Sequence, residues 1–130
     1  MRTRLAIVMC AVSMAVSGRA LAHHSFAAEF DANKPVTLTG TVTKLEWTNP
    51  HIWFFLDVKG EDGTVTNWGL EMAGPAQLVR AGWKRDSMKV GDVVTVEASR
   101  ARDGRNIANA LTVVLTGTGQ RLFARTPLGP

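Results

Sequence analysis

Histidine is the residue type in this chain best suited to chemistry, and its three copies fall in two places. His23 and His24 are adjacent, and His51 lies well apart from them in the sequence. Imidazole nitrogens bind late transition metals, and copper stands at the top of the divalent affinity series. An N-terminal histidine also chelates through its α-amine, so with a second imidazole it offers three nitrogens to Cu(II). We therefore predict a site for copper or another transition metal formed by His23 and His51, with His24 assisting.

The first 22 residues decide whether His23 becomes N-terminal, and they have the features of a secretory signal peptide. Two arginines precede an apolar run, residues 5–16, that is too short to span a bilayer as a helix. Ala20-Leu21-Ala22 is an A-x-A cleavage site, and cleavage after Ala22 makes His23 the first residue. An uncleaved membrane anchor is the alternative. We expect a protein of the periplasm or a secreted protein.

The predicted cleavage also changes the charge balance. The full chain has 15 Lys+Arg against 11 Asp+Glu, a net charge of +4. Three arginines and the single cysteine, Cys10, belong to the signal peptide, which leaves the mature chain near +1. A disulfide framework is therefore excluded. Single-stranded nucleic acid requires a basic groove, so we expect no nucleic-acid partner. No second apolar stretch is long enough to span a membrane as a helix, and we expect no membrane span after cleavage.

Alternating apolar residues predict β-strands over most of the mature chain. The pattern covers residues 35–47, 51–58, 64–72, 93–99 and 108–115. One helical window, 75–82, begins at a proline and ends at Gly82. The apolar phase of the long first strand shifts after Lys44, which predicts a bulge, and Gly40 would allow a bend. The residues predicted to face inward are Val36, Leu38, Val42, Ile52, Phe54, Leu56, Val58, Trp68, Leu70, Met72, Val94, Val96, Ala98, Leu111, Val113 and Leu115.

The order of these elements, β-β-β-α-β-β, is that of the OB-fold, a five-stranded Greek-key barrel. We therefore predict an all-β domain with one short helix and an OB-like barrel. A small β-sandwich is the alternative, for which five strands are few. The predicted organisation is a signal peptide (1–22), an N-terminal arm (23–34), the barrel (35–116) and a C-terminal tail (117–130). The tail shows no period, and we expect it to be loose except near Leu122 and Phe123.

OB-folds bind ligands on the face of strands two and three and on the neighbouring loops. On that template, the barrel rim receives Trp47, Asn49 and His51 from the first loop. Glu71 comes from the end of the third strand, and Arg102 from the loop before the last strand. A rim that binds a small molecule, a glycan or a partner protein through these residues is the metal-free alternative to the copper site.

The first strand limits the copper hypothesis, because it lies between the arm and His51. A straight strand of about 12 residues extends roughly 40 Å, and the fully extended arm has about the same reach. A site formed by His23 and His51 then requires the arm to run back along the barrel nearly extended. No G-x-S-x-G, H-E-x-x-H or paired-carboxylate motif occurs, so we expect a protein that is not an enzyme.

Four sequence blocks carry a resemblance to known proteins. They are HHSFAAEFD at 23–31, VTLTGTV at 36–42, EWTNPH at 46–51 and KVGDVVTVE at 89–97. Over nearly all of residues 23–124, the chain resembles a family of small exported bacterial proteins of unknown function. The resemblance implies an exported β-rich domain, and it directs attention to the arm and the first loop. We expect a binding or accessory domain.

Overall fold

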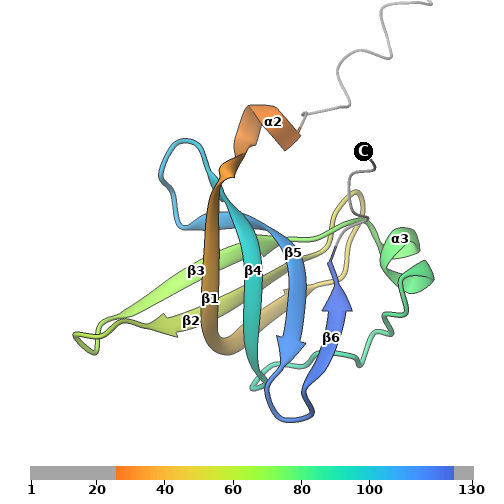
Figure 1. Ribbon diagram of the computed structural model, residues 1–130. Helices are drawn as coiled ribbons and strands as arrows, with labels where there is room; N and C mark the ends of the chain where they lie inside the picture. Colours follow the sequence, from red (N-terminus) through yellow and green to blue (C-terminus); the bar gives the residue numbers. More distant parts are fainter. Residues whose placement is uncertain (1–25, 125–130) are drawn as a thin grey trace, which may run out of the picture.

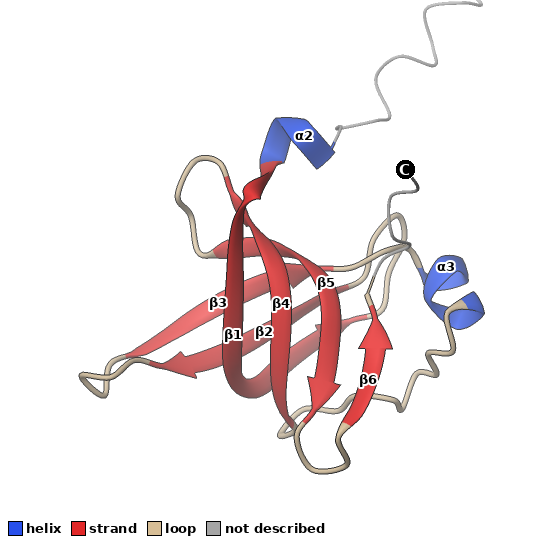
Figure 2. Cartoon of the chain, viewed as in Figure 1, coloured by secondary structure: helices blue, strands red, loops and turns tan. Residues whose placement is uncertain are grey.

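The computed structural model describes residues 26–124, which form a β-barrel with two short helices (Figures 1 and 2). The helices are α2 (Phe26–Glu29) and α3 (Pro75–Arg80). The strands are β1 (Phe30–Glu46), β2 (Trp53–Lys59), β3 (Val65–Glu71), β4 (Val93–Ala101), β5 (Ile107–Leu115) and β6 (Gln120–Phe123). Within residues 26–124, no helix has the length and apolar character needed to cross a membrane.

Pairing between β3 and β5 closes the strands into a ring. The order is β3-β2-β1-β4-β5, and residues 69–71 of β3 then pair in parallel with residues 107–109 of β5. Partners followed round the ring from Pro35 are Ser99, Asn109, Glu71, Trp53 and finally Glu46. The walk returns to β1 far from its start, and this stagger is what barrel closure requires. The predicted OB-like barrel is confirmed, and the sandwich alternative is wrong.

The long strand β1 serves both sides of the barrel because it bends. Its first part pairs with β4 and its last part with β2, and the register shifts between Val42 and Lys44, as the phase of the apolar residues predicted. Gly40 lies where the two parts meet. A Cβ at this position would lie 2.5 Å from the carbonyl oxygen of Asp57, so the close approach of β2 excludes any side chain.

The core consists of inward-facing apolar residues from the five strands of the ring, β1 to β5. Two features of the chain after β3 close one end: Leu78 on α3, and Trp83, whose Nε1 donates to the carbonyl of Phe123 at 2.9 Å. Leu111 departs from the predicted inward set and is only half-buried. The register between β4 and β5 shifts so that Thr112 and Ala110 pair with consecutive residues of β4, which leaves Leu111 out of the alternation.

The structure extends the domain beyond both predicted bounds. Helix α2 and the first five residues of β1 lie within the predicted arm, so the ordered pairing begins before Pro35. Leu122 and Phe123, near which the predicted tail was expected to be held, belong to the short strand β6, and Leu122 pairs with Val113 of β5. The predicted signal peptide, His23 and His24 lie outside the described residues.

Candidate functional site

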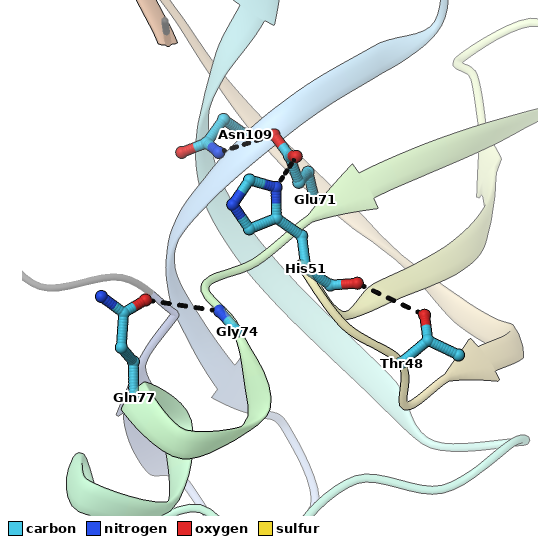
Figure 3. A network of polar contacts seen from close by, with 6 residues as sticks. All are labelled: Thr48, His51, Glu71, Gly74, Gln77 and Asn109. Atoms are coloured by element: carbon cyan, nitrogen blue, oxygen red, sulfur yellow. Dashed lines mark hydrogen bonds and ion pairs between the residues drawn. The ribbon is translucent and has the colours of Figure 1, made fainter. Parts of the chain in front are cut away.

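His51 lies just before β2, and its ring points to the end of β3, where it meets the carboxylate of Glu71 (Figure 3). Its Nδ1 forms a hydrogen bond with Oε1 of Glu71. The other carboxylate oxygen of Glu71 accepts a hydrogen bond from Nδ2 of Asn109 at 3.1 Å. The His51 side chain is 48% exposed and that of Glu71 only 10%. The buried carboxylate of Glu71, oriented by Asn109, therefore positions the half-exposed imidazole of His51.

The fold explains how these three residues meet. Leu70 and Met72 face the core, so the side chain of Glu71 between them lies on the opposite face of the sheet, where it is still largely covered. The parallel pairing of β3 with β5 sets Asn109 directly beside Glu71. The backbones of Ile52 and Met72 extend the β2–β3 ladder by a 2.8 Å hydrogen bond, which fixes the loop carrying His51 next to Glu71.

The loop that carries His51 is itself held in place. Thr48 donates its hydroxyl to the carbonyl of His51 at 3.4 Å (Figure 3). A Cβ at Gly74 would lie 2.6 Å from the carbonyl oxygen of Pro50, so the loop packs tightly on the segment that begins α3. The position of the imidazole thus depends on backbone contacts as well as on Glu71.

The contact with Glu71 decides which ring nitrogen faces outward. A carboxylate accepts hydrogen bonds, so this geometry assigns a hydrogen to Nδ1. In the neutral ring, the lone pair is then on Nε2, for which no partner occurs within residues 26–124. A histidine that ligates a metal characteristically donates its other ring N–H to a carboxylate in this way. The arrangement presents one nitrogen for a metal ion or for a hydrogen-bond donor.

His51 needs other ligands if it is to hold a metal ion. The described part of the chain has no group of three or more His, Cys, Asp or Glu side chains arranged for a metal. The remaining predicted donors, His23 and His24, belong to the segment that precedes α2. Whether a site is feasible therefore depends on how far α2 lies from His51.

The barrel stagger corrects the expectation that the arm must run back nearly extended. Phe30 pairs with Ala101 of β4, and β4 is separated from β3 only by β5. Two strand spacings amount to roughly 10 Å, far less than the length of a straight β1. His23 precedes Phe30 by seven residues, and a chain of seven residues spans at most about 25 Å. Chain length therefore allows His23 to approach His51.

The other predicted rim residues have different surroundings. Trp47 is partly buried against the core, and the guanidinium of Arg85 lies 5.8 Å from the centre of its ring. Asn49 is exposed and precedes a cis peptide bond to Pro50. Arg102 contacts the arm, where its Nε donates to the carbonyl of Ala27 at 2.7 Å. The structure thus brings His51 and Glu71 together and directs Arg102 elsewhere.

Asn109 is the site residue that the sequence did not reveal. It occupies an outward position of β5, which is a generic place for an asparagine, and its meaning comes only from the pairing with β3. Its side chain is buried, and its Oδ1 has no hydrogen-bond partner among residues 26–124. Asn109 therefore contributes one hydrogen bond to the site, the one that orients Glu71.

Comparison with solved structures supports the fold. The crystal structure of Rim1, a mitochondrial single-stranded DNA-binding protein from S. cerevisiae, is similar with a TM-score of 0.50 and 14% sequence identity. The similarity covers 66% of this chain and 93% of Rim1. At this identity the likeness concerns the barrel alone. No curated protein matches this chain.

Comparison with protein families gives a match over most of the chain. The sequence model of a family of unknown function (DUF6152) matches residues 11–110. The matched range includes all three histidines together with Glu71 and Asn109. This chain therefore belongs to the family of unknown function DUF6152.

Proposed function

We propose that this chain is an exported domain that binds copper or another late transition metal through His51 and the mature N-terminus. In this proposal, Nε2 of His51 is one ligand, and the α-amine and ring of His23 supply two more, with His24 assisting. The observation that carries the proposal is the contact of the half-exposed His51 ring with the buried carboxylate of Glu71. That contact is typical of the partner that orients a metal-ligating histidine.

Chemistry and chain length both favour copper at this place. Three nitrogen donors suit Cu(II), which binds amine and imidazole ligands more tightly than the other divalent ions of its row. Phe30 pairs with β4, two strand spacings from β3, and His23 precedes it by seven residues, a length that can reach across two strands. We propose a binding role rather than an enzymatic one, since the sequence has no nucleophile motif to accompany the histidines.

The metal-free alternative is a rim that binds a small molecule, a glycan or a partner protein. It depends on Trp47, Asn49 and Arg102 as ligand contacts. Two of these three already have intramolecular partners, Arg85 for Trp47 and the arm for Arg102. An external ligand would have to displace those partners, so this alternative has less support than the metal site.

The name of Rim1 raises single-stranded DNA as a ligand, and we do not extend it to this chain. The predicted mature chain is close to neutral. On the outer face of β2, the ammonium group of Lys44 lies 5.4 Å from the centre of the Phe55 ring, and Lys44 is itself paired with Glu46. A stacking platform for bases needs exposed rings and unpaired positive charge.

A Cu(II) titration of the tagless chain that begins at His23 tests the proposal. We expect one equivalent to bind with a submicromolar dissociation constant, measured by calorimetry against a competing chelator. His51→Ala and a single added N-terminal residue should each weaken binding by at least tenfold, because each removes a ligand atom. Asn49→Ala, in the same exposed loop, is the matched control and should bind as the unchanged chain does.

Three results would contradict the proposal. They are the absence of stoichiometric binding, an affinity that His51→Ala leaves unchanged, and an exported protein whose N-terminal residue is not His23. The last is determined by intact mass and N-terminal sequencing of protein recovered after export. If copper does not bind and a ligand instead responds to Asn49→Ala, the metal-free rim is the better account.

A further inference from the structure

We infer that Arg102 is a positioning residue that fastens the arm to the barrel. It thereby fixes the position of α2, the element that directly follows the N-terminal residues 23–25. The inference rests on the proposed metal site, for which His23 must stay close to His51. It gives Arg102 a role different from the ligand contact that its place in an OB-fold loop predicts.

Arg102 contacts the arm at three points with backbone and side chain. Its backbone N–H donates to the carbonyl of Glu29 at 2.9 Å. Its Nε donates to the carbonyl of Ala27 at 2.7 Å, and its Nη1 lies 3.5 Å from a carboxylate oxygen of Asp31. One residue in the loop after β4 thus contacts both α2 and the start of β1.

The loop that bears Arg102 is arranged to make these contacts. Asp103 accepts the backbone N–H of Arg105 at 3.1 Å and its Nε at 2.5 Å, which fixes the loop's shape. Nη2 of Arg105 in turn lies 3.7 Å from a carboxylate oxygen of Glu29. A hollow of about 400 Å³ between α2 and the loop is lined by these side chains together with Arg102 and Ala28.

Helix α2 depends on such contacts because it is too short to persist alone. It has four residues, and isolated helices below about 12 residues are marginal in water. A stacking contact between Phe26 and Phe30 at 5.8 Å joins it to the start of β1, where Phe30 pairs with Ala101 of β4. Arg102 adds contacts to α2 itself from the loop that follows β4.

Release of the arm should lower metal affinity without loss of any ligand. With α2 fastened, the first held residue is Phe26, three positions after His23. With α2 released, it is Phe30, seven positions after His23, so the tether is more than twice as long. Each doubling of a flexible segment lowers the effective concentration of its end about threefold, and the loss of orientation adds to this. We expect Arg102→Ala to weaken Cu(II) binding about 3- to 10-fold.

The experiment compares Arg102→Ala with Arg121→Ala, an arginine of similar exposure that pairs with Glu97 on the β4–β6 face. Each variant is titrated with Cu(II) twice, once beginning at His23 and once with an added N-terminal residue. We expect a loss only for Arg102→Ala and only in the chain that begins at His23. A general destabilisation would lower affinity in both chains, and that result would overturn the inference.

A second measurement needs no metal and separates this inference from the proposed function. The backbone N–H at position 102 remains in Arg102→Ala, so its hydrogen-exchange rate reports whether it still bonds to Glu29. We expect faster exchange there in Arg102→Ala and no change in Arg121→Ala. Unchanged exchange overturns the inference even if copper binds. Faster exchange in a chain that binds no copper shows the fastening to be real and contradicts the metal site.

Discussion

Glu71 contacts His51 through a carboxylate that the barrel buries and the imidazole ring that it leaves half exposed. The contact joins the loop before β2 to the end of β3. Asn109, near the start of β5, donates a hydrogen bond to the same carboxylate. Three segments remote in sequence therefore determine the position of one ring nitrogen. Such fixed geometry is more than a solvated surface histidine needs, and it is what a metal ligand requires.

Glu71 should contribute to stability as well as to binding. Glu71→Ala leaves the Asn109 amide buried with no partner at either end, since its Oδ1 already has none. An unsatisfied buried polar group costs about 1–3 kcal/mol, and we expect a decrease of this size in the free energy of unfolding. Urea denaturation measures it. Glu46→Ala, which removes a more exposed carboxylate paired with Lys44, should change the free energy of unfolding by no more than about 0.5 kcal/mol. Equal losses would show that Glu71 is not specially held.

The last strand, β6, should matter through one of its two adjacent apolar residues. Leu122 is 6% exposed and belongs to the core, whereas Phe123 is 51% exposed. Leu122→Ala should lower the unfolding free energy by about 2–5 kcal/mol, and Phe123→Ala by no more than about 0.5 kcal/mol. Denaturation of the two variants side by side is the measurement. Similar small effects would mean that the segment after β5 does not pack as a strand.

The sequence was most informative where local alternation and burial agree. In β2, burial alternates from Trp53 to Leu56 as predicted, and the predicted inward residues Phe54 and Leu70 are fully buried. The bulge after Val42 followed from the shift in apolar phase. Strand β6 was missed because four residues are too few to show a period, and it gains its hydrogen bonds from β5.

The site was only half predictable, for a related reason. His51 and Glu71 could be placed on one rim because the OB-fold order assigns their loops. Asn109 could not, since its partner depends on a parallel pairing between strands that no local pattern encodes. The contact of Arg102 with the arm could not be predicted either, because the sequence indicated no regular element in the arm. Arg102 was therefore placed on the ligand rim, whereas its side chain contacts Ala27 of α2.

Acid should weaken the loop that fastens the arm. The backbone N–H of Arg105, and next its side chain, hold the pKa of Asp103 below its ordinary value of 3.8. A lowered carboxyl pKa means that the folded state binds this proton less readily than the unfolded state. The stabilisation is therefore present above pH 3.8 and is lost as pH falls through the lower, folded-state pKa.

Substitution of Asp103 isolates this pH effect. The difference in unfolding free energy between the unchanged chain and Asp103→Asn should be constant near neutral pH and should shrink below about pH 4. Urea denaturation across pH 3 to 7 measures the difference. A gap between the two chains that keeps its size at pH 3 would contradict the role assigned to the ionised carboxylate.

The electron paramagnetic resonance spectrum of bound Cu(II) tests the metal site most directly, because its superhyperfine lines report the nitrogen ligands. The sample is the tagless chain beginning at His23, loaded with one equivalent and compared with His51→Ala. The account predicts a tetragonal Cu(II) signal with three nitrogen ligands, of which His51→Ala removes one. A spectrum that is the same in both proteins would contradict the account, because His51 would then not be a ligand.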